Sequence, residues 1–437
     1  MAEFRIPIRI LYGDGTLEHI SGLRGDRMLL VHDCEAACRI AQKQARRTGM
    51  HIRVFSVPEG PVDGPTVLEG AKALMEFKPG WIIAIGGHAA MDCAKLMRIF
   101  YERPDLTPDD LVRSDIPRMK LGRTRLIAVP TLGSNGGEAT GYAALRNPRE
   151  CLEQVIYCPG LMPHAAIIDP LLLNALPHTH TGEAVLSALA LSVEAAVSPE
   201  GSFFSRPFAM QAMHTIISST IAFSCLPFPS EPLLNAQILS GIAHYNASPG
   251  LCSAMVHGSM GLFGCVSFGT LCAVYLPAII RRSTGQYSEG YAAIASELGL
   301  KDTPEALAAL IEEYADMLGL PLKLCELERD KNARIIRNLC IIRTAIERNY
   351  KRINDTIHME YRGLLSMPEF IPSASLQQLS DDGVNFIKKP STKLCHHVIE
   401  INRLISDRIN NCKGLFPVWI SWAYLKELFL MPDGLTE

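Results

Sequence analysis

The sequence predicts an α/β fold in which a parallel sheet, with helices on both faces, is followed by an all-helical region. In the first 170 or so residues, short apolar runs typical of buried strands alternate with segments of helical periodicity. After about residue 178 the strand-like runs disappear and long helical stretches follow one another. A strand, a glycine pair and a helix over 81–95 form the centre of the first region. We therefore expect domains at 1–178 and 179–380, and a helical extension at 381–437.

The individual elements follow from the same patterns. Strands are expected at 27–33, 51–57, 81–86, 124–130 and 165–170, with helices at 35–48, at 67–77 and from 89 onward. In the second region, helices are expected at 182–197, 207–222, 233–244, 251–263, 269–281, 287–298, 304–318 and 331–348. Near the end of the chain, 394–409 has a helical apolar stripe. Residues 415–431 are apolar and aromatic, which suits packing on the domain or, alternatively, contact with a partner.

Residues 81–95 carry the first indication of a binding site. An apolar run ends at Gly86 and Gly87, and apolar residues at helical spacing begin at Ala89. This geometry points free backbone N–H groups and the positive end of a helix dipole at an anion, so a phosphate or pyrophosphate is the expected guest. A tight turn without any ligand explains the stretch equally well. The usual dinucleotide fingerprint, with three spaced glycines, is absent.

Asp33 lies at the end of the first expected strand. In a parallel sheet with helices on both faces, an acid at this place commonly accepts hydrogen bonds from ribose hydroxyl groups. The alternative is that Asp33 caps the helix that follows it. The sequence alone does not decide between the two roles.

Composition restricts the classes of function. The 437 residues carry a formal net charge of −3, with acids and bases interspersed, so no basic stripe of the kind that binds nucleic acid is expected. No apolar run reaches the roughly 18–20 residues that a membrane span requires, and no secretory signal is visible. The 13 cysteines lack paired spacing. We therefore expect reduced thiols and a cytoplasmic protein without a membrane anchor.

Several motifs carry a resemblance to a known family. They lie at 86–92 with Lys95, at 128–131 with Gly136 and Glu138, at 166–170 with 176–177, and at 194–198, 241–257 and 318–321. In this order and spacing they resemble the iron-containing (group III) alcohol dehydrogenases over most of residues 5–330. The resemblance implies a Rossmann-like NAD(P)-binding domain followed by a helical domain that holds a divalent metal, the dehydroquinate synthase-like fold. It also implies an oxidoreductase acting on a small alcohol or aldehyde.

The resemblance implies a set of cofactor-binding residues: Asp33, Gly86, Gly87, His88, Asp92, Thr131, Leu132 and Gly136. The acid at position 33 favours NAD over NADP, because a carboxylate repels a 2′-phosphate. His88 departs from the family pattern, since it replaces a glycine of the phosphate turn. A lysine that usually lies near the nicotinamide ribose falls on Glu153.

The metal ligands are the largest departure from the family. By resemblance, the first two ligands are an Asp and a His four residues apart, and these positions fall on Ser187 and Leu191. The third and fourth, both His, fall on Ser253 and on Phe268, or on Ser267 if an insertion lies later. Hydroxyl and apolar groups do not hold iron or zinc, which need imidazole, thiolate or carboxylate ligands. We therefore expect no metal at this site.

Three functions are compatible with these changes. The first is a metal-independent NAD(P)-linked oxidoreductase in which His257, matching a family histidine near the nicotinamide, stabilises the developing alkoxide. The alternative for His257 is a core histidine bonded to a helix carbonyl. The second is a catalytically inactive paralogue acting as a nucleotide-binding, scaffold or regulatory subunit. The third is a relocated metal site drawn from His178, His180, His244, His257, Cys252, Cys265 and Cys272.

The resemblance also implies a homodimer. The family commonly pairs through N-terminal strands, which correspond here to the alternating segment 4–11. Such a segment at a chain end is suited to pairing with the edge of a partner's sheet.

Overall fold

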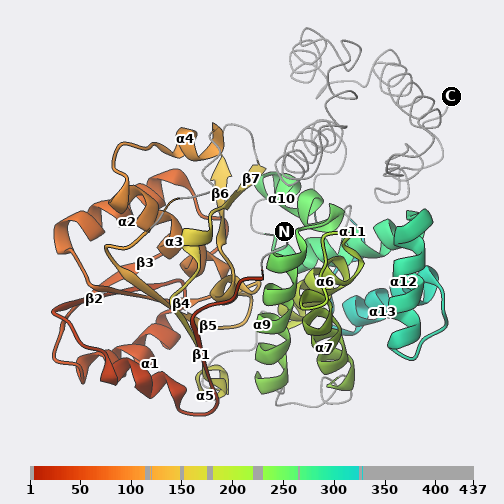
Figure 1. The fold of residues 1–437 in the computed structure, drawn as a ribbon, viewed down its shortest axis with the longest axis horizontal. Coiled ribbons are helices and arrows are strands. Elements are labelled where there is room, and N and C mark those ends of the chain that lie inside the picture. The colour runs from red at the N-terminus through yellow and green to blue at the C-terminus, as the bar shows by residue number, and fades with distance from the viewer. Residues whose placement is uncertain are drawn as a thin grey trace, which may run out of the picture.

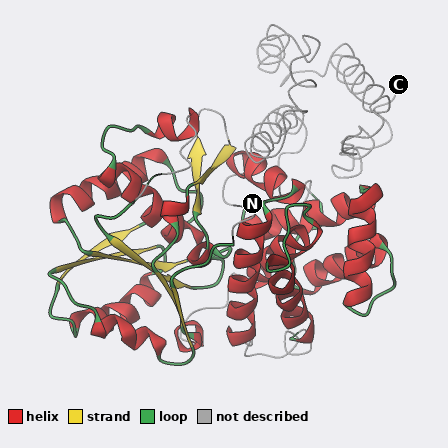
Figure 2. Cartoon of the chain, viewed as in Figure 1, coloured by secondary structure: helices red, strands yellow, loops and turns green. Residues whose placement is uncertain are grey.

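The computed structural model describes residues 4–113, 119, 121–147, 152–174, 181–219, 230–263, 266–323 and 327. Within them, an α/β unit lies beside a group of helices, as expected from the sequence (Figures 1 and 2). The expected helix at 331–348, and the segments 394–409 and 415–431, lie outside the described residues.

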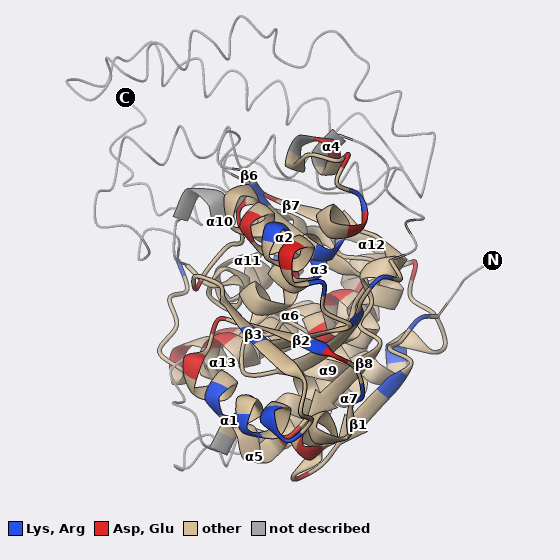
Figure 3. Cartoon of the chain, turned by 90° about the vertical axis from the view of Figure 1, so that its left-hand side faces the viewer, with Lys and Arg blue, Asp and Glu red and all other residues tan. Residues whose placement is uncertain are grey.

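None of the helices in the described part is long and apolar enough to cross a membrane. Figure 3 shows basic and acidic residues interspersed on the face it displays.

The α/β unit is built on a six-stranded sheet in which every adjacent pair of strands is parallel. Its strands, in spatial order, are β1 (Arg9–Tyr12), β8 (Ala165–Ile168), β5 (Arg125–Pro130), β4 (Trp81–Gly86), β2 (Arg27–His32) and β3 (His51–Ser56). The stretch singled out in the sequence, β4, is therefore an interior strand. The prediction of a parallel sheet is confirmed.

Both faces of the sheet are covered because side chains alternate along each strand. Leu29 and Val31 of β2 pack in one apolar cluster with α2 (Gly64–Phe77) and α3 (His88–Glu102). The intervening residues, Met28 and Leu30, pack in a second cluster with α1 (Glu35–Arg46) and the short helix η1 (Thr16–Gly22). Strands buried on both faces explain the nearly continuous apolar runs in the sequence.

Several elements were missed in the sequence or differ from what it predicts. The largest is an antiparallel hairpin of β6 (Tyr142–Asn147) and β7 (Leu152–Tyr157), which forms a separate two-stranded sheet. The alternating segment 4–11 forms a strand only from Arg9, and that strand pairs with β8 inside its own chain. Short helices also appear: α4 (Pro108–Arg113), η2 (Gly137–Ala139), η3 (Pro159–Leu161) and α5 (Pro170–Asn174).

The second region is helical, as predicted. Its described helices are α6 (Thr181–Val197), α7 (Ser205–Ser218), α9 (Ser230–Ala247), α10 (Leu251–Phe263), α11 (Phe268–Arg282), α12 (Gly285–Glu297) and α13 (Pro304–Met317). Helix α6 is buried along most of its length and contacts each of the other six. A helix surrounded in this way must be apolar on nearly all sides, which explains the run of Ala, Leu and Val in its sequence.

A close backbone contact joins the two regions. A Cβ atom built on Gly136 would lie 2.3 Å from the Cα of Gly241 in α9, so neither position has room for a side chain. Beside it, the amide side chain of Gln237 accepts a hydrogen bond from the Gly133 backbone N–H. The loop after β5 is therefore fixed against α9, and the site described below lies around this loop.

Candidate functional site

The turn between β4 and α3 already holds an anion, supplied by the protein itself. The Asp33 carboxylate accepts hydrogen bonds from the backbone N–H of Gly87, at 3.0 and 3.1 Å, and of Ala90, at 3.0 Å. A Cβ atom on Gly86 would lie 1.7 Å from Asp33 Oδ1, so a glycine is required there. The N-terminus of α3 thus binds a carboxylate, as the strand–glycine–helix pattern predicts for an anion.

The proposal that Asp33 caps the helix following it is wrong. The N-cap of α1 is Cys34, without a side-chain capping bond, whereas Asp33 caps α3 across the sheet. The reason is that β2 and β4 are neighbours in the parallel sheet, so their carboxyl ends meet at the same edge. The sequence places these residues more than fifty positions apart and does not reveal which strands are adjacent.

The loop after β5 lies alongside this turn. The Thr131 N–H donates to the Gly86 carbonyl at 2.8 Å, and the His88 N–H donates to the Gly133 carbonyl at 3.1 Å. His88 Nε2 is buried without a hydrogen-bond partner among the described residues. Thus Asp33, Gly86, Gly87, His88, Thr131 and Leu132, six of the predicted cofactor-binding residues, gather at the carboxyl ends of β2, β4 and β5.

The other two predicted cofactor-binding residues lie apart from this group. Gly136 faces α9, as described above, and Asp92 is buried one turn further along α3. Burial raises the pKa of Asp92 to about 6, and the nearby Lys95 ammonium opposes the rise. Burial lowers the pKa of Lys95 to about 8, although its ammonium donates to Thr140 Oγ1 and to the Tyr142 carbonyl. This buried pair connects α3 to β6.

The four positions at which the resemblance predicts lost metal ligands are all buried. Ser187 Oγ donates to Asn135 Oδ1 at 2.6 Å, and Leu191 belongs to the apolar core of the helical region. Ser253 bonds to Glu194, and Phe268 belongs to the same apolar core as Leu191. These residues do not fit iron or zinc, because two hydroxyl groups and two hydrocarbon side chains offer no suitable set of donors.

The described residues do not offer a relocated metal site either. No group of three or more His, Cys, Asp or Glu side chains able to hold a metal is found among them. Burial raises the pKa values of Cys252 and Cys272, which keeps both thiols neutral, and His244 is bonded to Glu194. A relocated site stays a hypothesis only for sets that include His178, His180 or Cys265, which lie outside the described residues.

His257 lies where the hairpin of the α/β unit meets the helical region. Its Nδ1 atom is 3.0 Å from Oε2 of Glu153 on β7, and its ring centroid is 5.3 Å from that of Phe268. The Glu153 side chain is 3% exposed and that of His257 is 15% exposed. The alternative that a helix carbonyl satisfies His257 is therefore wrong, since the partner is a carboxylate. Sequence reasoning noted Glu153 only as a replaced lysine, because the two residues are 104 positions apart.

Comparison with known proteins agrees with this architecture. Residues 7–170 match the family model for iron-containing alcohol dehydrogenases, and residues 181–356 match the model for the C-terminal part of Fe-containing alcohol dehydrogenases. An NADPH-dependent butanol dehydrogenase of Clostridium saccharobutylicum is 28% identical over 338 residues, covering 75% of this chain and 87% of the relative. An aldehyde-alcohol dehydrogenase of Streptococcus pneumoniae is 30% identical over 358 residues, 74% of this chain, but the match spans only 40% of that longer protein.

Solved structures show the same fold. An iron-containing alcohol dehydrogenase from Thermococcus thioreducens superposes with a TM-score of 0.69 at 26% identity, over 80% of this chain and 93% of that one. A sulfoacetaldehyde reductase from Bifidobacterium kashiwanohense, solved in complex with NAD+, gives 0.68 at 20% identity, over 78% of this chain and 92% of that one. By its two family models, its sequence relatives and its fold, the chain belongs to the iron-containing alcohol dehydrogenase family.

Proposed function

We propose that the protein is an NAD-linked oxidoreductase acting on a small alcohol or aldehyde, and that it works without a metal ion. The observation that carries this proposal is the His257–Glu153 pair. The Glu153 carboxylate binds Nδ1 of the ring. The other ring nitrogen, Nε2, has no hydrogen-bond partner among the described residues. An imidazole held at Nδ1 by a carboxylate is oriented to give or take a proton at Nε2.

In this proposal the nicotinamide ring supplies or accepts the hydride, as it does in other enzymes that use this cofactor. The protein must then neutralise the alkoxide that forms as an aldehyde is reduced. A protonated His257 donates its Nε2 proton to that oxygen, and in the reverse direction the neutral ring accepts the alcohol proton. Glu153 keeps the imidazole in place and balances its charge while it is protonated.

The turn at the start of α3 suits the adenosine end of a dinucleotide. The Asp33 carboxylate lies against Gly86 and offers acceptor lone pairs beyond those used by Gly87 and Ala90. Ribose hydroxyl groups are donors that match such a carboxylate, whereas a 2′-phosphate would be repelled by it. This supports NAD rather than NADP.

A second candidate is a catalytically inactive paralogue that binds a nucleotide and serves as a scaffold or regulatory subunit. The observation that favours it is the occupation of the α3 N–H groups by Asp33, together with the apolar core around Leu191 and Phe268. The two candidates differ in turnover. With EDTA present throughout, the enzyme oxidises NADH when short-chain aldehydes are added, whereas the paralogue gives only quenching of tryptophan fluorescence by NADH.

We also propose that the protein forms a homodimer through β1. This strand is an edge of the six-stranded sheet, and Ile8 beside it is 81% exposed. Phe203 is 86% exposed, and its ring contacts that of Phe204, which in turn contacts Phe4 of the N-terminal segment. An edge strand with neighbouring exposed apolar side chains is well suited to pairing with a second copy.

The variant Ile10→Lys is expected to convert a dimer into a monomer, because it places a charge on the exposed face of β1. The matched control is Val54→Lys on β3, the opposite edge of the same sheet, since Ile10 is 37% and Val54 39% exposed. Light scattering after size-exclusion chromatography measures both masses. A wild-type monomer, or equal effects of the two variants, would contradict pairing through β1.

A further inference from the structure

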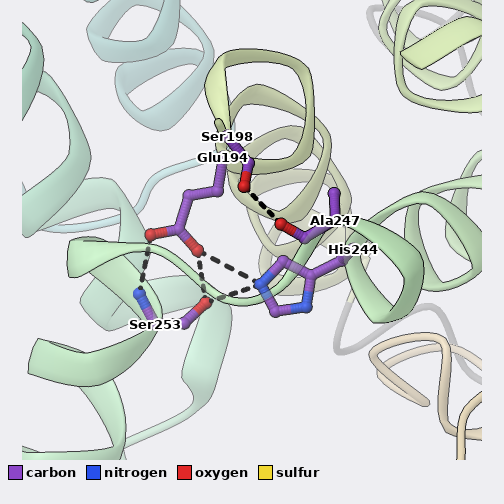
Figure 4. Close-up of polar contacts among 5 residues, drawn as sticks. All are labelled: Glu194, Ser198, His244, Ala247 and Ser253. Carbon is purple, nitrogen blue, oxygen red and sulfur yellow. Dashed lines mark hydrogen bonds and ion pairs between the residues drawn. The ribbon is translucent and has the colours of Figure 1, made fainter. Parts of the chain in front are cut away.

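Three helices of the second region meet at a buried polar cluster that the proposed chemistry does not use. It consists of Glu194 from α6, His244 from α9 and Ser253 from α10 (Figure 4). The Glu194 carboxylate accepts from Ser253 twice: from its backbone N–H at 3.1 Å and from its hydroxyl. His244 Nε2 lies 3.3 Å from Glu194 Oε2 and 3.1 Å from Ser253 Oγ.

The proton positions in the cluster follow from this geometry. The serine hydroxyl has a single proton, which it donates to Glu194, so its oxygen accepts a hydrogen bond from the Nε2–H of His244. His244 Nδ1 is buried without a partner among the described residues. The imidazole is therefore oriented by its Nε2 contacts, and the cluster links three separate helices through one carboxylate.

The carboxylate is charged although it is buried. Burial alone would raise the pKa of Glu194, but the hydrogen bonds from His244 and Ser253, with the nearby imidazole, outweigh burial and lower it below its ordinary value. Other titratable groups near Glu194 include Cys252, Cys272 and Tyr291. Burial raises the pKa of each, so these groups are neutral and add no second negative charge beside the carboxylate.

The Glu194 carboxylate also lies against Gly250, where a side chain would not fit. A Cβ atom on Gly250, which precedes α10, would lie 2.5 Å from Glu194 Oε1. At the other end of the contact, Ser198 Oγ donates to the Ala247 carbonyl and joins the end of α6 to the end of α9 (Figure 4). The surroundings of the cluster are thus shaped to bring these helices together.

The position of the cluster relates it to the lost metal site. By the resemblance, Ser253 falls at the family's third ligand position, and α6 carries the first two positions, Ser187 and Leu191. A metal held at those places would connect α6 to α10. We propose that the Glu194–His244–Ser253 cluster replaces a metal ion as the cross-link that holds α6 and α10 together, with α9 added. This inference concerns the integrity of the helical region and holds whether or not the protein reduces an aldehyde.

Thermal unfolding of the full-length protein tests the cross-link. Glu194→Gln leaves the imidazole without its charged partner, and an apparent melting temperature about 6 °C or more below wild type is expected. Ser253→Ala, which keeps the backbone hydrogen bond to Glu194, is expected to give a fall of about 3 °C. If Glu194→Gln is insoluble, Ser253→Ala decides the test.

The matched control is Ser240→Ala. Ser240 is a buried serine one turn before His244 whose hydroxyl, among the described residues, bonds only to the Gln237 carbonyl of its own helix. Hydrogen exchange then locates the effect: exchange about tenfold faster in peptides from α6, α9 and α10, with α1 and α2 unchanged, supports a local cross-link. The proposal is overturned if Ser253→Ala lowers the melting temperature no more than Ser240→Ala. It is also overturned if EDTA lowers the melting temperature of the wild type, because a metal would then hold the helices.

Discussion

Replacing His257 by glutamine is expected to lower kcat for NADH-dependent aldehyde reduction by about 100- to 10,000-fold, the usual contribution of a general acid. Glutamine keeps a polar side chain of similar reach but does not release a proton. Because the imidazole acts on the reacting oxygen and not on the nucleotide, the dissociation constant for NADH should change little. Steady-state kinetics and fluorescence titration measure the two quantities separately.

Two further variants define the role of His257. Glu153→Gln removes the carboxylate that orients the ring but keeps the ring itself, so kcat should fall less than in His257→Gln, and the pH profile of kcat should change. His214→Gln, on the exposed side of α7, is the matched control and should behave as wild type. Full activity of His257→Gln would show that another group supplies the proton.

Replacing Gly87 by aspartate is expected to weaken NADH binding about a hundredfold or more, which corresponds to roughly 2.7 kcal/mol. A Cβ atom on Gly87 would lie 3.4 Å from Asp33 Oδ2 and 3.4 Å from the Gly133 carbonyl. The added carboxylate would therefore stand between Asp33 and the loop after β5. There it would repel a pyrophosphate and cancel the attraction of the α3 dipole.

The control for this variant is Gly80→Asp. Gly80 lies just before β4, at the opposite end of the same strand, and a Cβ atom there meets no atom within 4 Å. Its substitution adds the same charge far from the turn, so NADH affinity should be retained. An unchanged dissociation constant for Gly87→Asp would rule out the turn as the nucleotide site.

Periodicity predicted most of the strands and helices, because those of the α/β unit are buried on defined faces. In β2, for example, the residues from Met28 to Val31 alternate between two apolar clusters. In the helical region, α10 begins at Leu251, the residue that the sequence predicts. The β6–β7 hairpin was missed although its strands are as long as β2, because they include residues such as Ala143, Ala144 and Glu153 that do not favour strands.

The site was less predictable, because its contacts join distant parts of the chain. The glycine turn was visible from local sequence, but Asp33 meets it only through the order of the strands. The partners of His257 and Glu194 lie on other elements, 104 and 50 or more positions away. The sequence signals for the cluster were indirect: Ser253 falls, by resemblance, at a ligand position, and His244 was a candidate for a relocated metal site.

The metal content of the purified full-length protein tests the central claim most directly. Ser187, Leu191, Ser253 and Phe268 do not offset the cost of removing water from a divalent ion, because none of them is an imidazole, thiolate or carboxylate. Elemental analysis should therefore find no stoichiometric iron or zinc, and reductase activity should persist in EDTA. One equivalent of tightly held iron or zinc, together with activity that disappears when the metal is removed, would contradict the account.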